Sequence, residues 1–233
     1  MNGLKRLVAA IGNCYVRYVC RREREHPAFA YANERPVEYR FVFQQLTRRY
    51  PRTVLDVGSG LSALPNLMQN CGFDVMAIDN MEAFWPAGIV NRHFHVLEDD
   101  ILHPRLTKRF EMITCISVLE HIRQSDQAVA SMANLLEEGG CLILTFPYNE
   151  GDYCDNVYRV AGSRASQDVS HMAQAFSRRE IDRWCLGHGL EVAEQEYWRF
   201  FTGPFWGVGD LVLPPIRGDR TELHQISCVL LRK

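Results

Sequence analysis

The chain has 233 residues, of which 47% are hydrophobic and 23% are charged, values typical of a soluble globular protein. This length predicts one α/β domain with a large core and is too short for two full-sized domains. Because 26 Lys and Arg face 28 Asp and Glu, the formal charge of −2 argues against a general nucleic-acid binder, and no nucleic-acid partner is expected.

The eight cysteines are scattered along the chain and form no C-x-x-C pair. This pattern is typical of reduced thiols in a cytoplasmic protein and argues against a disulfide framework or a zinc site. No apolar run approaches the roughly 20 residues that span a bilayer. We therefore expect a cytoplasmic protein.

An amphipathic helix is predicted at the N-terminus, where apolar residues from Leu4 to Val19 recur at helical spacing and Arg17 and Arg21 follow another face. Its apolar face can pack on the domain or lie on an anionic membrane surface, and it is also suited to a homodimer interface. A second amphipathic helix begins near Pro36 and ends before Pro51. Residues 1–50 are thus expected to be helices that cap a domain spanning residues 51–233.

Short apolar strands alternate with helices from Thr53 onward, the pattern of a parallel sheet with crossover connections. Helices are expected at 63–69 and 127–136, with Gly139-Gly140 breaking the chain before the fifth strand. The expected strands are 54–57, 75–78, 94–97, 112–116, 141–145, 190–192 and 226–231.

Residues 147–175 show no clean periodicity, and a segment of this length in a compact domain is usually a lid or a binding loop. Ser177 and Glu180, which follow it, have the spacing of a capping box at the start of a helix. A dense aromatic stretch from Tyr197 to Trp206 either seals a small-molecule pocket or forms a partner surface.

A glycine-rich turn follows the first predicted strand. Asp56 precedes Gly58 and Gly60, whose missing β-carbons allow a tight turn and the close approach of a ligand. Asp79 ends the second strand about 20 residues later, the separation expected for an acid that binds a ribose. These features predict a nucleoside site.

The same glycines leave a second interpretation open. Residues 58–63 also fit the dinucleotide pattern G-x-G-x-x-G/A, so a nicotinamide-dependent oxidoreductase remains an alternative.

Several ordered motifs resemble those of the class I S-adenosylmethionine-dependent methyltransferases, most closely the type-11 group, over roughly residues 36–233. They are Asp56-Val57-Gly58-Ser59-Gly60, Asp79, Asp99-Asp100-Ile101, Ser117-Val118-Leu119-Glu120-His121-Ile122 and Leu135-Leu136-Glu137-Glu138-Gly139-Gly140. The resemblance implies a Rossmann-like, doubly wound sheet of seven strands in the order 3-2-1-4-5-7-6, with the last strand antiparallel.

The resemblance also implies the cofactor S-adenosyl-L-methionine and the residues that bind it. The turn would cradle the methionine end, Asp79 the ribose and Asp100 the adenine, whereas Asp99 is expected to be a solvated loop acid. The candidate cofactor-binding residues are Asp56, Gly58, Ser59, Gly60, Asp79, Asn80, Asp100, Ile101 and Ser117.

A methyltransferase of this kind would act on an oxygen or nitrogen of a small metabolite or glycan. Tyr148, directly after the fifth strand, and His171, in the lid segment, are the candidate catalytic residues. The alternative is a cofactor-binding partner or regulatory protein that does not catalyse transfer.

A metal site is not expected. Related O-methyltransferases carry a Glu-x-x-Glu-His motif that binds a divalent ion, but Ser117 stands here in place of the first Glu. His93 and His95 would share one face of the third strand, without a third ligand in sequence, and are expected to be surface or packing residues.

Overall fold

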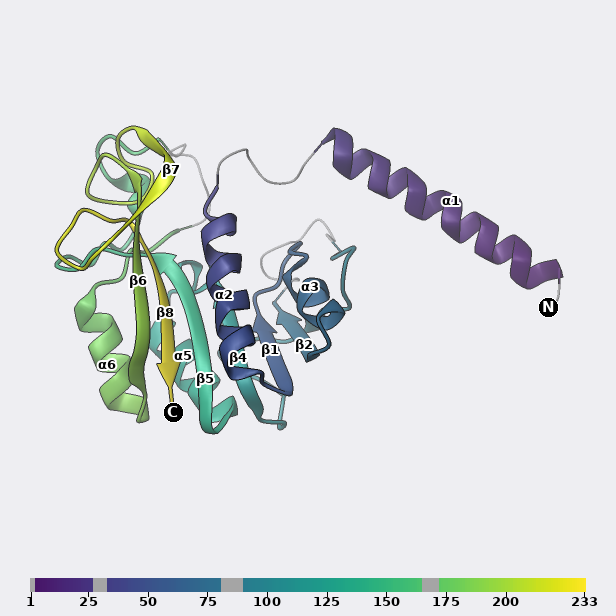
Figure 1. Ribbon diagram of the computed structural model, residues 1–233, viewed down its shortest axis with the longest axis horizontal. Helices are drawn as coiled ribbons and strands as arrows, with labels where there is room; N and C mark the ends of the chain where they lie inside the picture. Colours follow the sequence, from purple (N-terminus) through teal and green to yellow (C-terminus); the bar gives the residue numbers. More distant parts are fainter. Residues whose placement is uncertain (1–2, 27–32, 81–89, 165–171) are drawn as a thin grey trace. The chain divides into compact units, whose positions relative to one another are not determined.

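The computed structural model describes residues 3–26, 33–80, 90–164 and 172–233 (Figure 1). It divides into two compact units, residues 1–35 and 36–233. Helix α1 (Gly3–Glu25) lies in the first unit, and nearly all of α2 (Arg35–Arg49) lies in the second. The division thus places α2 with the sheet, whereas the sequence suggested a boundary near residue 50. None of the described helices has the length and apolarity needed to cross a membrane.

The described residues of the second unit contain one sheet of eight strands, in the order β3-β2-β1-β4-β5-β8-β6-β7. The first five pair in parallel, while β8 is antiparallel to both β5 and β6. The predicted fold class and strand order are therefore confirmed, with one additional strand. The strands are β1 (Thr53–Val57), β2 (Asp74–Asp79), β3 (Leu97–Glu98), β4 (Phe110–Ile116), β5 (Leu136–Pro147), β6 (Glu191–Phe201), β7 (Leu211–Gly218) and β8 (Ile226–Arg232).

Among the described strands, the additional strand β7 pairs with β6 alone, at the edge of the sheet. Sequence reasoning missed it because Pro214 and Pro215 lie inside it, and proline lacks the N–H that a strand donates. An edge position tolerates these residues because one side of the strand needs no partner.

Two strand boundaries differ from those predicted. β3 has only two residues, so His93 and His95 lie before it and are exposed, and the prediction that they share a strand face is wrong. β5 begins at Leu136, so Gly139 and Gly140 lie inside the strand where its register with β4 shifts. A β-carbon on Gly140 would lie 2.8 Å from the carbonyl oxygen of Glu137, which explains the glycine at this irregularity.

Helices cover both faces of the sheet. α5 (Ser125–Leu135) and α6 (Arg178–His188) bury their apolar residues against one face, while α2 and α3 (Leu64–Asn70) pack on the other. In Figure 1, α2 passes in front of the sheet and α5 lies behind it. This sandwich leaves the carboxyl ends of the strands as the edge where a ligand can bind.

The capping box predicted for α6 is confirmed. Ser177 accepts the backbone N–H of Arg179, and the Glu180 carboxylate accepts the backbone N–H of Ser177 at 2.8 Å. Gly189 ends the helix in the left-handed conformation, as glycine favours.

The segment after β5 is irregular, as its composition predicts, apart from the short 3-10 helix η2 (Val157–Arg159). Its described residues pair within the segment and with one other segment. Cys154 pairs with Ala175, and Ser163 pairs with Val208 in the connection between β6 and β7. The aromatic stretch is used largely for packing: Phe200 and Phe201 are buried, and Trp206 contacts the rings of Phe201 and Tyr158.

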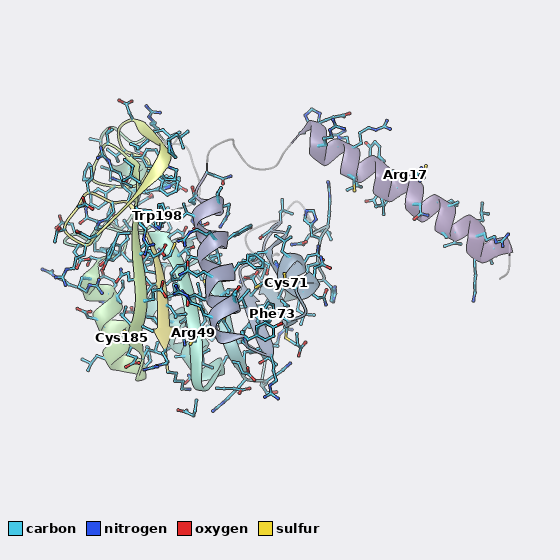
Figure 2. The ribbon with its side chains drawn as sticks, viewed as in Figure 1. Arg17, Arg49, Cys71, Phe73, Cys185 and Trp198 are labelled. Atoms are coloured by element: carbon cyan, nitrogen blue, oxygen red, sulfur yellow. The ribbon has the colours of Figure 1, made fainter. Side chains whose placement is uncertain are left out.

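Trp198, labelled in Figure 2, links β6 to α2. The guanidinium of Arg40 lies 5.4 Å from the centre of its ring, a cation–π distance, and also pairs with the buried carboxylate of Glu196. Glu196 further receives the indole N–H of Trp198 and pairs with Arg217. These contacts fix α2 on the sheet.

Candidate functional site

The glycine turn between β1 and α3 lies at the carboxyl end of the sheet. Gly58 and Gly60 have positive φ angles of 75° and 47°, a region that residues with a β-carbon rarely adopt. A β-carbon on Gly58 would also lie 2.4 Å from the side chain of Val118, in the loop after β4. Glycine is therefore required for the turn itself and for the close approach of the neighbouring loop.

Asp56 joins this turn to the neighbouring strand β4. One carboxylate oxygen accepts the hydroxyl of Ser59 and the other accepts that of Thr114 in β4, both at 2.6 Å. The side chain is buried, with 3% of the residue exposed. Two of the predicted cofactor-binding residues, Asp56 and Ser59, thus bind each other and tie the turn to β4.

Asp79 lies beside the turn at the end of β2. Its Oδ2 accepts the backbone N–H of Gly60 at 2.5 Å. Burial raises the pKa of Asp79, and hydrogen bonds from the backbone amides of Gly60 and Asn80 partly oppose that shift. A carboxylate offers about four acceptor positions, so these two amides leave capacity for the hydroxyls of a ribose.

Ser117 occupies the same edge of the sheet, directly after β4. It has a φ of 51° although it is not glycine, and its backbone N–H binds the carbonyl and hydroxyl oxygens of Thr145 in β5. Its hydroxyl donates to Oε1 of Glu38 at 2.5 Å, and Thr145 donates to the same oxygen at 2.7 Å. A backbone strained in this way is often found at functional sites.

A family model described as "Methyltransferase domain" matches residues 29–195. The chain belongs to this methyltransferase family. The family, enzyme class and cofactor class expected from the sequence are confirmed at that level.

Curated relatives of this methyltransferase agree with that assignment. The ubiquinone biosynthesis O-methyltransferase of Alkalilimnicola ehrlichii is 28% identical over 164 residues, which cover 64% of each chain. That of Coxiella burnetii is 24% identical over 171 residues, covering 68% of this chain and 71% of the relative. The match therefore spans less than two thirds of the first relative.

Solved structures share the fold. The N-methyltransferase NodS of Bradyrhizobium japonicum, in complex with S-adenosyl-L-homocysteine, has a TM-score of 0.52 at 16% identity, covering 86% of this chain and 87% of that one. The 1,6-didemethyltoxoflavin-N1-methyltransferase of Burkholderia thailandensis has a TM-score of 0.55 at 14% identity, covering 100% and 91%. At these identities the likeness extends to the fold alone.

Of the two acids after β3, Asp99 differs from its prediction. Asp99 is not a solvated loop acid: it is 7% exposed and accepts the backbone and side-chain N–H groups of Arg105. Asp100 is half-buried and binds the backbone N–H of Leu102, while Ile101 is buried in the core. Their roles toward adenine stay predictions.

The sequence did not predict three side chains that support the methyltransferase site. Asn91 donates to the carbonyl oxygens of Gly60 and Ser62 at 2.8 and 3.0 Å, which fixes the outer side of the glycine turn. Glu38 reaches the site from α2, and its neighbour Tyr39 binds the hydroxyl of Ser62 at 2.7 Å. No local pattern marks these residues, because each acts on a segment remote in sequence.

The loop after β4 is joined to the segment after β5. The Nδ1 atom of His121 lies 2.7 Å from the carbonyl oxygen of Met172, and the Gln174 side chain donates to the carbonyl oxygen of Ile122. Within the described residues, no group of three or more His, Cys, Asp or Glu side chains is arranged to hold a metal ion.

Of the two candidate catalytic residues, the structure describes Tyr148. His171 lies outside the described residues. Tyr148 is buried, its hydroxyl donates to Glu150 at 2.8 Å, and its ring stacks on that of His224. Burial and the Glu150 hydrogen bond both raise the pKa of Tyr148, so the phenol stays protonated near neutral pH. Its catalytic role stays a prediction.

Proposed function

We propose that this protein transfers a methyl group from S-adenosyl-L-methionine to an oxygen or nitrogen of a small metabolite or glycan. The hydrogen bond between Gly60 and Asp79 carries the proposal, because it places a carboxylate against a glycine turn at the carboxyl end of the sheet. This arrangement suits a nucleoside whose ribose binds Asp79 while its other end lies along the turn.

The proposed cofactor site is built from a turn and its supports. Asp79 would accept the ribose hydroxyls, and the backbone around Gly58–Gly60 would face the methionine end. Asp56 and Asn91 hold that backbone in place from opposite sides. When bound, the cofactor would supply an electrophilic methyl group on a sulfonium.

The acceptor class rests on the relatives and on Ser117. The curated relatives are named as O-methyltransferases, and the structural neighbours described above as N-methyltransferases, which supports an acceptor oxygen or nitrogen. Ser117 is half-buried and donates its proton to Glu38, so its oxygen can accept a hydrogen bond from an acceptor O–H or N–H.

We propose that Ser117 and Glu38 together orient the acceptor and receive its proton. During methyl transfer, the acceptor proton would pass to Ser117 and the Ser117 proton to Glu38. Orientation and general-base catalysis of this kind are the principal demands of an in-line displacement. The segment after β5 would exclude water from the site.

The first test is a calorimetric titration of S-adenosyl-L-homocysteine and NADH into the purified protein, in parallel. We expect S-adenosyl-L-homocysteine to bind and NADH not to bind. Replacement D79A should weaken binding more than tenfold, since losing hydrogen bonds to a charged group costs about 1.5–3 kcal/mol. D74N is the matched control, because Asp74 begins the same strand but is exposed.

The outcomes separate the alternatives. Binding of NADH alone would overturn the assignment in favour of an oxidoreductase. Binding of S-adenosyl-L-homocysteine without transfer to any acceptor in a panel of phenols, amines and glycans would favour a regulatory cofactor-binding protein. Equal affinity in D79A and the parent would show that Asp79 does not bind the ribose.

A further inference from the structure

Helix α1 (23 residues) has an apolar face over residues 4–18, opposite a basic side, and ends in the charged stretch Arg21–Glu25. Leu4, Leu7, Val8, Ile11, Tyr15 and Tyr18 recur at spacings of three and four residues, and each is more than half exposed. At 100° per residue they fall within one stripe of the helix. No other described element of the first unit covers this stripe.

The opposite side of α1 is basic. Arg6, Arg17 and Arg24 lie roughly half a turn away from the apolar stripe, and Lys5 and Arg21 lie on its flanks. Arg17 is labelled on the helix in Figure 2. Residues 3–25 contain six basic residues and two acidic residues, a net charge of +4, whereas the whole chain has a net charge of −2. The positive charge is therefore concentrated on this helix.

We propose that α1 binds the surface of an anionic lipid bilayer, with its apolar stripe in the acyl boundary and its basic residues at the headgroups. Charge complementarity favours an anionic bilayer over an uncharged partner, because a purely apolar contact would not require basic residues along the helix. Tyr15 and Tyr18 suit the same position, since each has an apolar ring and a polar hydroxyl that can stay in the headgroup layer.

The chemistry of this surface differs from that of the nucleoside site. It recognises phosphate-bearing headgroups such as phosphatidylglycerol through charge, and acyl chains through apolar burial. The proposal goes beyond methyl transfer and does not depend on it. It brings the catalytic unit to a membrane and so favours acceptors that are themselves held at one.

The test is flotation of the full chain with vesicles. We expect the protein to float with vesicles of equal parts phosphatidylglycerol and phosphatidylcholine, and to remain in the soluble fraction with phosphatidylcholine alone or when salt is raised. Equal recovery in the soluble fraction with both vesicle types would overturn the proposal.

Charge variants test the basic face. R17E combined with R21E should weaken partitioning by about tenfold or more, because each basic residue near an anionic surface contributes on the order of a fivefold factor. R49E combined with R109E changes the net charge equally at exposed positions outside α1 and should float like the parent. Equal loss in both pairs would show that only net charge matters and would contradict binding through α1.

Apolar variants test the other face. L7Q combined with I11Q should abolish flotation, whereas A9Q combined with N13Q, at the same spacing on the polar side, should not.

Light scattering without lipid tests the competing interpretation, in which the apolar stripe of α1 binds a second copy of the chain. Membrane binding would be overturned in favour of a second copy of the chain by two results together. The parent would be a dimer that does not float, and L7Q/I11Q would be a monomer. A matching circular dichroism spectrum and unfolding midpoint confirm that each variant folds.

Discussion

Gly58 combines two requirements in one residue, a positive φ and the absence of a β-carbon facing Val118. We expect G58A to lower the free energy of unfolding by about 2–4 kcal/mol, the sum of backbone strain and overpacking. G72A is the matched control, because Gly72 has a φ of 95° but open space around it, so it should show the strain alone. Urea unfolding measures both, and equal losses would contradict the steric conflict with Val118.

The charge state of Asp79 predicts how cofactor affinity depends on pH. Its pKa is raised in the free protein by burial. Ribose hydroxyls would donate to the ionised form and lower that pKa, so affinity should be full above the raised pKa and fall as pH drops through it. D79N should bind more weakly with no such dependence. Titrations of S-adenosyl-L-homocysteine from neutral to acidic pH check this, and parallel curves for both proteins would contradict it.

Tyr148 can be tested apart from any catalytic role. Y148F removes the hydrogen bond to Glu150 and should lower the free energy of unfolding by about 1.5 kcal/mol or more, because the acceptor is charged. Affinity for S-adenosyl-L-homocysteine should not change. A fall in the methyl-transfer rate at unchanged stability would instead support the predicted catalytic role.

The capping box of α6 sets the start of that helix. S177A should lower the free energy of unfolding by about 1 kcal/mol, because the side chain that accepts the Arg179 N–H is lost. S177T keeps a hydroxyl at the cap and should lose only a fraction of this. Thermal or urea unfolding of both variants measures the difference, and equal losses would show that the cap is not responsible.

How far the elements were predictable depends on where their interactions lie. The capping box, the glycine turn and the parallel strands could be predicted because their signals lie within a few residues of one another. β7 could not, because its prolines are acceptable only at an edge, and edge position is a property of the whole sheet. Asp99 was misjudged because Arg105, six residues away, compensates its burial. Glu38 and Ser117 are 79 residues apart and meet only when α2 packs on the sheet.

At the scale of the molecule, the division after residue 35 predicts that the second unit folds by itself. A chain of residues 36–233 should keep the unfolding midpoint and the affinity for S-adenosyl-L-homocysteine of the full protein, because the core and the site lie within that unit. Calorimetry and the cofactor titration provide the measurement. A lower midpoint would instead support the first interpretation of the N-terminal segment, that it packs on the domain.

The position of β8 has a consequence for biosynthesis. This strand is made after β5, β6 and β7, yet it lies between β5 and β6 and hydrogen-bonds to both. Until residues 226–232 have left the ribosome, β5 keeps one open side and the β6–β7 ribbon cannot join the sheet. The nascent protein must therefore hold its earlier strands in an incomplete, aggregation-prone sheet, and ribosomal stalling before residue 226 would release a product with exposed strand edges.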